Sequence, residues 1–299
     1  MGQLSKIVFT GISGLLGGYF SKLKSPGYEL LGVADNNVVD NGKYLFKVDI
    51  TDKEQVLDFV KKIKPDVIVH AASIGNVDYC ESHPDEAFRV NLEGTKNVIE
   101  AAKEIGAKII FISSNAVYDG ENTPYDENAK LNPIDIYGKT KVEGERIVLG
   151  SNLEYVIIRL MTMYGWPQNG GRANPVTWII DSLKKGEKIN VVNDIYNNHL
   201  WANQAAEAIW EVIKQAKFGH IFNVAGLDCV SRYDLALKVA EIFDLDSSLV
   251  NPVSSDFFKA IAKRPKNTCF NITKMANDLG LKPLSIEEGL NLMKAENNI

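Results

Sequence analysis

Short apolar runs alternate with longer amphipathic stretches through the first half of the chain. The runs lack polar alternation, which predicts strands buried on both faces, at residues 6–10, 29–34, 44–48, 67–70, 108–113 and 155–159. The intervening stretches predict helices, at residues 15–23, 53–62, 85–105 and 135–149. Strands that alternate with helices predict an α/β fold with a doubly wound parallel sheet, which is Rossmann-like.

The pattern changes after Arg159. Residues 161–174 are rich in Gly, Asn and aromatic residues, which predicts a loop region. Helices are then predicted at 175–185, 202–216, 231–243, 256–262 and 272–279, with short strands near 189–192 and 220–224. We therefore expect a dinucleotide-binding domain over 1–160, to which 200–228 return. A smaller, mainly helical substrate lobe is expected within 161–299, interleaved with that domain and closing over the carboxyl edge of the sheet.

Composition excludes several functional classes. Of the 299 residues, 45% are hydrophobic and 24% are charged, so a packed core is expected rather than disorder. The net charge of −5 argues against nucleic acid or a membrane surface as a partner, because both attract basic proteins. No apolar run approaches the roughly 20 residues of a membrane span, and no signal peptide is recognisable, so a cytoplasmic location is expected.

The cysteines and histidines form no metal-binding pattern. Cys80, Cys229 and Cys269 are widely spaced and in no CxxC arrangement. We expect them to be reduced thiols rather than a disulfide framework. The four histidines are scattered without HxxxH or HExxH spacing, so no metal site is expected.

A glycine-rich turn between the first strand and the first helix carries the strongest binding signal. Gly11, Gly14 and Gly17 form a GxxGxxG spacing. Glycine is needed where the backbone turns tightly, approaches a pyrophosphate closely, or brings a helix against a strand. The helix N-terminus then offers free N–H groups to the phosphates. The expected cofactor contacts in this turn are Gly11, Ser13, Gly14, Leu15, Leu16 and Gly17.

An acidic residue ends the second strand. A carboxylate at Asp35 can accept hydrogen bonds from both hydroxyls of an adenosine ribose and would repel a 2′-phosphate. This favours NAD(H), with NADP(H) as the alternative. Asp49 and Ile50, after the third strand, are expected to face the adenine. The other interpretation of Asp49 is an N-cap for the helix that follows Thr51.

Three residues in the middle of the chain suggest carbonyl chemistry. Tyr137 and Lys141 are separated by four positions, so they share one face of a predicted helix. An ammonium beside a phenol favours the phenolate and lowers the phenol's pKa from about 10. Ser114 ends the strand 108–113, where a hydroxyl points into the ligand crevice of an open α/β sheet. We expect it to donate a hydrogen bond to a substrate carbonyl.

With these motifs in this order, the chain resembles the extended short-chain dehydrogenase/reductase family. The resemblance implies that Ser114, Tyr137 and Lys141 form a catalytic triad. It also implies that Ala71, Ala72 and Ser73, after His70, border the nicotinamide half of the cofactor. The segment 90–95 (VNLEGT) matches the family's helix motif that ties the central strands together.

Within that family the chain is most similar to dTDP-4-dehydrorhamnose reductases. The segments that carry this likeness are 76–81 (NVDYCE), 193–194 and 264–267 (RPKN). The likeness implies NAD(P)H-dependent reduction of the C4 ketone of a nucleotide-linked 6-deoxysugar. Three departures fall on the substrate side: Ser114-Asn115 replaces the usual Thr-Asp, Thr162 replaces a tryptophan, and 194–200 lacks the usual Gly and Pro-Thr.

Other functions stay open at this point. A nucleotide-sugar 4-epimerase has a similar strand end at 114–118, and it would use its cofactor without net consumption. A 4,6-dehydratase is disfavoured, because Asn115-Ala116 replaces its usual Asp-Glu pair. A non-catalytic regulatory subunit that binds NAD(P) predicts loss of Tyr137 or Lys141, and both are present.

The substrate's diphosphate needs cationic partners. Arg264 and Lys266 are the candidates in the second lobe, with Arg172 and Lys188 as weaker ones. Asn115 is expected to bind substrate beside Ser114. For Trp166, Trp178 and Trp201 we favour packing over stacking on a base. A homodimer is left open.

Overall fold

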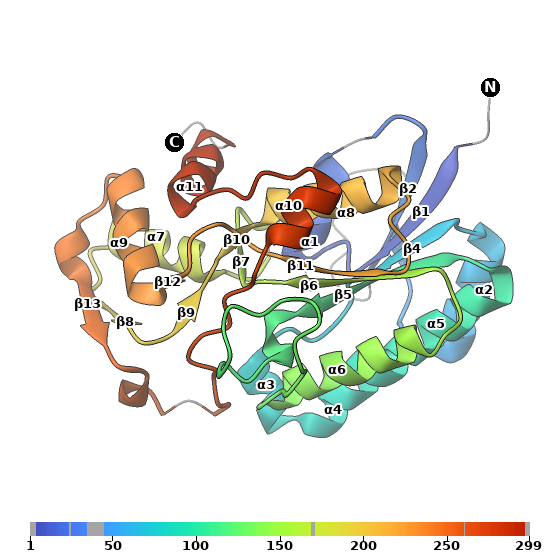
Figure 1. The fold of residues 1–299 in the computed structure, drawn as a ribbon, viewed down its shortest axis with the longest axis horizontal. Helices are drawn as coiled ribbons and strands as arrows, with labels where there is room; N and C mark the ends of the chain where they lie inside the picture. The colour runs from blue at the N-terminus through green and yellow to red at the C-terminus, as the bar shows by residue number, and fades with distance from the viewer. Residues whose placement is uncertain (1–3, 24, 35–44, 169–170, 260, 297–299) are drawn as a thin grey trace.

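The computed structural model describes residues 4–23, 25–34, 45–168, 171–259 and 261–296. Its centre is a seven-stranded, wholly parallel sheet with the order β11-β6-β5-β4-β1-β2-β3 (Figure 1). The strands are β1 (Ser5–Thr10), β2 (Tyr28–Ala34), β3 (Leu45–Lys47), β4 (Val67–His70), β5 (Lys108–Ser114), β6 (Tyr155–Leu160) and β11 (His220–Val224). The predicted doubly wound, Rossmann-like fold is confirmed.

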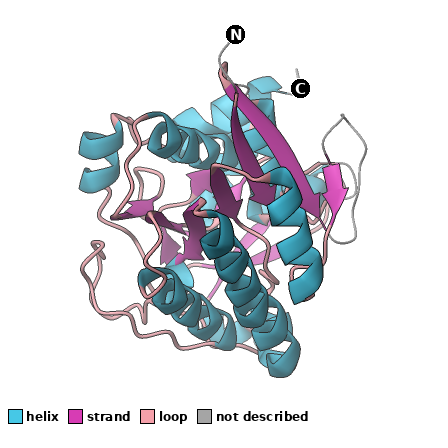
Figure 2. Cartoon of the chain, turned by 90° about the vertical axis from the view of Figure 1, so that its right-hand side faces the viewer, coloured by secondary structure: helices cyan, strands magenta, loops and turns pink. Residues whose placement is uncertain are grey.

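Helices cover both faces of the sheet (Figure 2). One face carries α2 (Lys53–Ile63), α5 (Gly94–Ile105) and α6 (Ile136–Leu149), and the other carries α1 (Leu15–Lys22) and α8 (Ala202–Lys214). Alternate residues of β1 enter different cores: Ile7 and Phe9 pack on the α1 side and Val8 packs on the α2 side. This two-sided burial is why the strands read as continuous apolar runs.

The predicted helix over 85–105 is continuous but not uniform. It consists of α4 (Pro84–Phe88), a π-helical turn at Arg89–Glu93, and α5. Asn91 is buried in this π-helical turn and is directed toward the loop after β4. There its Oδ1 accepts a hydrogen bond from the N–H of Ile74 at 2.7 Å. Its Nδ2 donates to Thr140 Oγ1 on α6 at 3.1 Å, so Asn91 fixes α6 relative to β4.

A second lobe lies beyond the carboxyl edge of the sheet (Figure 1). Its helices α7 (Pro175–Lys184) and α11 (Ile286–Glu296) pack against α9 (Arg232–Ile242). Its short strands pair as β7 (Met163–Tyr164) with β10 (Leu200–Trp201), β8 (Ile189–Val192) with β13 (Val250–Val253), and β9 (Tyr196–Asn197) with β12 (Val230–Ser231). The short helices α3 (Val77–Ser82) and α10 (Thr273–Leu279) complete the fold.

One predicted helix was wrong and one helix was missed. The helix predicted at 256–262 is only a 3-10 turn at Ser255–Phe257, and Phe257, Phe258 and Ile261 are exposed apolar residues. The apolar residues of this segment have the spacing of a helix face, but these three side chains are exposed rather than packed in the core. Helix α11 was not predicted, although Ile286, Leu290 and Met293 form its buried stripe.

Candidate active site

The glycine turn has the steric requirements that the sequence predicted. Gly11 has a φ of +76°, and a Cβ on it would lie 2.9 Å from the backbone of Ala72. A Cβ on Gly17 would lie 2.3 Å from the carbonyl oxygen of Ile12, so α1 packs directly on the turn. Gly14 is the N-cap of α1, and the first N–H groups of the helix are free of intrahelical partners by geometry. The turn fits a phosphate group.

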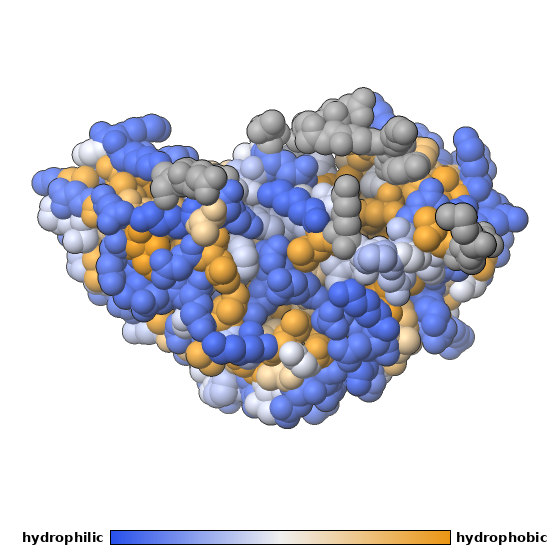
Figure 3. All heavy atoms as spheres, turned by 90° about the horizontal axis from the view of Figure 1, so that it is seen from above, coloured by the Kyte–Doolittle hydropathy of each residue, from blue (hydrophilic) through white to orange (hydrophobic). Residues whose placement is uncertain are grey.

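The turn opens into a single large cavity of about 830 Å³ at the carboxyl edge of the sheet. From the turn, the lining residues are Gly11, Ser13, Gly14, Leu15 and Leu16. Gly17 lies beneath the turn rather than in the lining. In the view from above, the outline of the molecule is hollowed between the second lobe at the left and the sheet at the right (Figure 3). Both parts contribute to the walls of this cavity.

The carboxylate expected to select the cofactor cannot be placed, since Asp35 lies outside the described residues. The expectation that Asp49 and Ile50 face the adenine stays a prediction. Asp49 Oδ1 accepts hydrogen bonds from the N–H and Oγ1 of Thr51, both at 2.8 Å. Ile50 is buried, and its side chain fills the space over Gly94. The N-cap of α2 is Asp52 rather than Asp49.

The segment after β4 contributes both backbone and side-chain atoms to the cavity and to the support of the glycine turn. Ala71 and Ser73 line the cavity, whereas Ala72 supports Gly11 from below. The Oγ1 of Thr10 accepts the N–H groups of Ala71 and Ala72, each at 3.2 Å. His70 is fully buried beside it, and burial lowers the pKa of its ring to about 3. His70 is therefore neutral, and its ring nitrogens form hydrogen bonds with Thr10 and Thr95 inside the fold.

The structure brings Ser114, Tyr137 and Lys141 together in the cavity wall. Ser114 is the last residue of β5, and α6 begins after the N-cap Asp135 with Tyr137 in its first turn. The Lys141 Nζ donates to the carbonyl of Ile112 at 3.0 Å and lies 5.7 Å from the centre of the Tyr137 ring. The predicted neighbours are thus confirmed as neighbours.

The electrostatics of this cluster differ from the sequence-based expectation. Burial raises the pKa of Tyr137 to about 12, and a hydrogen bond with Ser114 opposes this rise. The expected lowering of the phenol's pKa by Lys141 is not found, because the ammonium is directed to the Ile112 carbonyl. Burial lowers the pKa of Lys141 to about 8. At neutral pH the site therefore holds a protonated phenol and a charged amine.

A buried ion pair fixes the strand end that carries Ser114. Glu145 on α6 forms a bidentate pair with Arg159 on β6, with contacts of 2.9 and 2.7 Å. The same carboxylate accepts the hydroxyl of Ser113 at 2.5 Å. Arg159 also donates to Tyr118 at 2.7 Å. Both charges are compensated and hydrogen-bonded, which burial requires.

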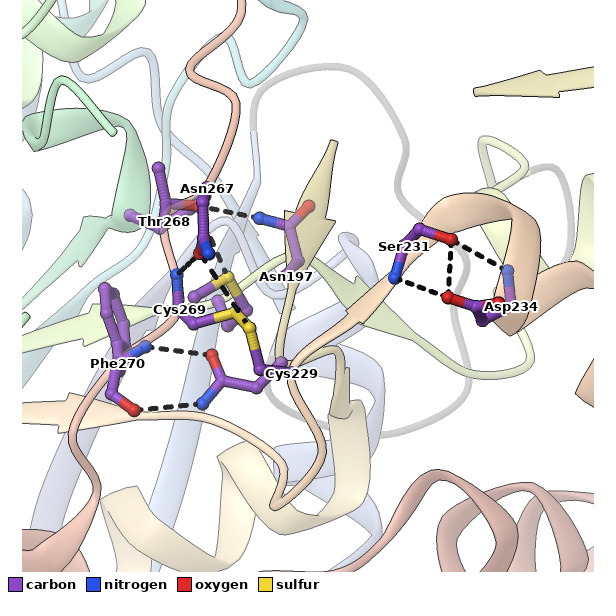
Figure 4. The surroundings of a disulfide bond; sticks show 11 residues. Asn197, Cys229, Ser231, Asp234, Asn267, Thr268, Cys269 and Phe270 are labelled. Atoms are coloured by element: carbon purple, nitrogen blue, oxygen red, sulfur yellow. Dashed lines mark hydrogen bonds between the residues drawn. A yellow bond between two sulfur atoms is a disulfide. The ribbon is translucent and has the colours of Figure 1, made fainter. Parts of the chain in front are cut away.

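A row of polar side chains continues from Ser114 into the second lobe. Asn115 Nδ2 donates to Thr268 Oγ1 at 2.8 Å, and Asn197 Nδ2 donates to the same oxygen at 2.7 Å. Figure 4 shows Asn197 directed at Thr268. All three residues line the cavity. Asn115 thus lies in the cavity beside Ser114, and its expected contact with substrate stays a prediction.

The cations proposed for a diphosphate are mostly engaged elsewhere. Arg264 lines the cavity, but its two terminal nitrogens contact the Asp78 carboxylate at 3.0 and 2.7 Å. Lys266 contacts Asp194 at 2.5 Å, outside the cavity lining. Lys188 is exposed and also lies outside the lining. Arg172 is an exposed residue of the lining.

The expectation of three reduced thiols is wrong. Cys229 and Cys269 form a disulfide with a Cα–Cα distance of 5.8 Å (Figure 4). Cys80 is buried and free. The two partners are 40 positions apart. Spacing alone cannot reveal such a pair, because it forms only when the strand β12 and the segment after Arg264 fold side by side. The disulfide holds the residue that follows Thr268.

Gln168, Thr268 and Arg232 are among the cavity residues that the sequence interpretation missed. Gln168 donates to the carbonyls of Ile12 and Gly14 at 2.9 and 3.1 Å, so it covers the glycine turn. Thr268 and Arg232 line the opposite wall. None belongs to a motif, and only the return of the second lobe brings them to the site. Of the tryptophans, Trp201 is buried, Trp166 is partly buried and Trp178 is 44% exposed.

Two features are absent from the described part of the chain. None of the described helices has both the length and the apolar character that a membrane crossing requires. No cluster of three or more His, Cys, Asp or Glu side chains suited to a metal ion occurs among the same residues.

The sheet, the glycine turn and the Ser114, Tyr137 and Lys141 cluster define an NAD(P)-dependent oxidoreductase. A family model described as the RmlD substrate binding domain matches residues 5–298. The chain belongs to this family.

Individual relatives match over most of their length. The dTDP-4-dehydrorhamnose reductase of Aggregatibacter actinomycetemcomitans is 28% identical, over 98% of this chain and 99% of its own. The Bacillus anthracis dTDP-4-dehydrorhamnose reductase, solved in complex with NADP, has a TM-score of 0.88 at 30% identity, covering 98% of this chain and 100% of that one. The methionine adenosyltransferase 2 subunit beta of Rattus norvegicus is also 28% identical, over 90% of this chain and 81% of its own.

Proposed function

We propose that this chain uses NAD(P)H to reduce the C4 ketone of a nucleotide-linked 6-deoxysugar, as its dTDP-4-dehydrorhamnose reductase relatives are named for doing. The observation that carries the proposal is the convergence of Ser114, Tyr137 and Lys141 on a cavity that also contains the glycine turn. The cavity is large enough for a nicotinamide and a nucleotide-sugar portion to meet in it.

The residues that would hold the dinucleotide are those of the glycine turn and of the segment after β4. They are Gly11, Ser13, Gly14, Leu15, Leu16, Ala71 and Ser73, with Lys141 toward the nicotinamide ribose. When bound, NAD(P)H supplies the hydride. Asp35 favours NAD(H), and the NADP in the Bacillus anthracis structure keeps NADP(H) as the alternative.

Tyr137 is the proposed general acid. Its pKa of about 12 keeps the phenol protonated at neutral pH, so it has a proton to give to the oxygen that becomes the alcohol. Ser114 is the proposed second donor to that oxygen. Donors fixed by β5 and α6 before the reaction stabilise developing charge without reorganising, which is the advantage of a preorganised site.

Lys141 is proposed to compensate the phenolate that proton transfer leaves behind. Its ammonium has three N–H groups, of which one is directed to the Ile112 carbonyl. The other two N–H groups are available to a ribose hydroxyl. The positive charge of the ammonium would stabilise a phenolate at Tyr137 electrostatically. With a pKa of about 8, Lys141 keeps this charge at neutral pH.

The test is turnover with a panel of dTDP- and UDP-linked 4-keto-6-deoxysugars, followed as loss of NADH or NADPH absorbance. Wild-type protein should consume cofactor in proportion to the alcohol formed. Tyr137→Phe should lower kcat by about 10²- to 10⁴-fold, the usual contribution of a general acid, and leave cofactor affinity close to wild type. An absence of cofactor oxidation with every member of the panel would refute the proposal.

The same experiment separates the alternatives. An epimerase interconverts two sugars with no net change in cofactor. The function of a non-catalytic regulatory subunit that binds NAD(P) would be unaffected by Tyr137→Phe. The intact triad supports the enzyme over that second reading.

The division into a dinucleotide-binding part, 1–160 with 200–228, and a substrate part within 161–299 belongs to the same proposal. It is supported by the pairing of β11 with β6 at the edge of the main sheet. A cytoplasmic location and a homodimer stay predictions, the second to be tested by light scattering after size-exclusion chromatography.

A further inference from the structure

One cation in the cavity has no role in the chemistry described so far. Arg232 is the first residue of α9 and lines the cavity wall opposite the sheet. Its backbone N–H donates to the carbonyl of Ile195 at 3.2 Å, which fixes the start of the helix. The Nε of its guanidinium is buried and has no hydrogen-bond partner in the described part of the chain. A buried N–H without a partner is costly, so such a group marks a place where a ligand completes the bonding.

The acidic residues around Arg232 are committed elsewhere. Asp234, two positions along the helix, has its carboxylate in a capping box with Ser231, at 3.1 Å from the backbone nitrogen and 2.7 Å from the hydroxyl (Figure 4). Asp78 also lines the cavity and its charge acts on Arg232, but its carboxylate is engaged by Arg264. Burial and the neighbouring Arg264 lower the pKa of Arg232, with Asp78 opposing this change. The local charge therefore favours an incoming anion.

The position of Arg232 along the cavity fits one end of a sugar nucleotide. Asn115, next to Ser114, is linked to Asn197 through the shared acceptor Thr268. Asn197 on β9 pairs with Val230 on β12, and β12 leads directly into Arg232. The hydroxyls that can donate to a substrate carbonyl therefore come first along the wall. Neutral polar side chains follow, and the cation Arg232 comes last. A keto-sugar linked to a diphosphate presents its ketone, its hydroxyls and its negative charge in this same order.

We propose that Arg232 binds the diphosphate of the nucleotide-sugar substrate and is the principal cation of that subsite. This inference rests on the proposed function for the identity of the ligand. Its guanidinium offers a planar set of donors that suits two phosphate oxygens at once. Arg264 instead holds Asp78 and thereby joins α3 to the second lobe, and Arg172 lies at the exposed rim.

The assignment differs from the sequence-based candidates in a testable way. Lys266 was the second sequence candidate, yet its amine is held by Asp194 and by Ser255 Oγ, each at 2.5 Å. A diphosphate would have to compete with that pair for a residue outside the cavity lining. Lys266→Gln therefore tests the competing assignment in the same assay.

The experiment measures binding, so it does not depend on turnover. Calorimetric titrations of the full chain, with NADPH present, use dTDP and thymidine as probes, and UDP and uridine as a second pair. In wild-type protein the diphosphate of the preferred nucleoside should strengthen binding markedly. Arg232→Gln should weaken binding of that nucleoside diphosphate by about 10- to 100-fold, the loss expected for a charged hydrogen-bonding pair, and leave the nucleoside unchanged. Arg232→Lys should recover part of this loss because it restores the charge without the planar donors.

The controls distinguish a subsite from a folding defect. Arg146→Gln removes an exposed arginine of α6 whose partner is Glu143, and it should bind every probe as the wild type does. NADPH affinity of Arg232→Gln should equal that of the wild type, since the glycine turn is on the other wall.

Two results would overturn the inference. One is wild-type affinity of Arg232→Gln for the diphosphate probe, and the other is loss of diphosphate affinity in Lys266→Gln alone. If wild-type protein turns over a keto-sugar while Arg232→Gln binds normally, the subsite fails and the reductase stands. If Arg232→Gln loses diphosphate affinity and no keto-sugar is reduced, the subsite stands and the reductase fails.

Discussion

The two walls of the cavity are built in different ways. The sheet wall takes its residues from consecutive β–α units: the turn after β1, the end of β5 and the first turns of α6. The opposite wall takes Asn197, Arg232, Arg264 and Thr268 from separate segments of the second lobe. Backbone geometry orients the first set, supported from behind by the Glu145–Arg159 ion pair and by Asn91. The second set depends on a network of side chains and on a disulfide.

This difference indicates how the two walls divide the work. A rigid parallel sheet presents phosphate-binding N–H groups and reacting side chains at one edge, which suits a step common to many substrates. Side chains on short strands and loops are easily exchanged, which suits the choice of a particular sugar. The departures of Asn115 and of residues 194–200 from the reductase pattern fall on or beside this second wall. If the two walls are separable, a change in one wall should leave the function of the other unchanged.

Loss of the disulfide should have the largest effect on stability, and it should act on the second wall. Closing a loop with a sequence separation of 40 stabilises the folded state by roughly 4 kcal/mol in the chain-entropy treatment. Cys229→Ser should lower the free energy of unfolding by up to that amount. Denaturant unfolding with and without dithiothreitol measures it, and dithiothreitol should leave the variant unchanged. Equal stability of wild type and variant under oxidising conditions would show that the crosslink is dispensable.

A methyl group at Gly17 should affect the sheet wall alone. Its Cβ would lie 2.3 Å from the Ile12 carbonyl oxygen, so the glycine turn must move. We expect Gly17→Ala to cost about 1–3 kcal/mol in stability and to weaken NADPH binding. Gly14→Ala is the graded comparison, because its Cβ would meet only the Gly11 oxygen at 3.3 Å. Nucleoside diphosphate affinity should stay unchanged in Gly17→Ala, and its loss would show that the walls are coupled.

The pH dependence of reduction should report on Lys141. Its pKa of about 8 means that the amine is charged at neutral pH and loses its charge as the pH rises through 8. Tyr137, with a pKa of about 12, stays protonated over this range. The value of kcat/KM should therefore be level near pH 7 and fall by about tenfold per pH unit well above 8. Arginine has a higher pKa than lysine, so Lys141→Arg should shift the fall in kcat/KM to higher pH. If the fall stays at the same pH, a group other than Lys141 causes it.

The smallest effect is expected at Asn115, where the two walls meet. Asn115→Ala removes one hydrogen bond to Thr268 and leaves that from Asn197. We expect a loss of about 1 kcal/mol, seen as a several-fold rise in KM for the keto-sugar with little change in kcat. A fall in kcat as large as that of Tyr137→Phe would place Asn115 in the chemical step.

The accuracy of the sequence interpretation follows the same division. The parallel sheet and the closeness of Tyr137 to Lys141 were predictable, because each depends on local patterns: buried apolar strands and a four-residue spacing on α6. The helix predicted at 256–262 failed because periodicity does not reveal whether an apolar face has a partner. The predicted lowering of the Tyr137 pKa was wrong, because burial, which no spacing reveals, raises it.

By itself, then, the sequence determined the order of strands and helices, the glycine turn and the residues that can carry a proton. Those features depend on neighbours a few positions apart, where backbone geometry leaves few choices. Only the tertiary structure decided which cysteines pair, that Arg264 is held by Asp78, and that Arg232 faces the cavity with an unpartnered Nε. These features depend on contacts between segments tens to hundreds of residues apart. The role of a charged residue there depends on which partner the fold places beside it, and the residue type does not reveal that partner.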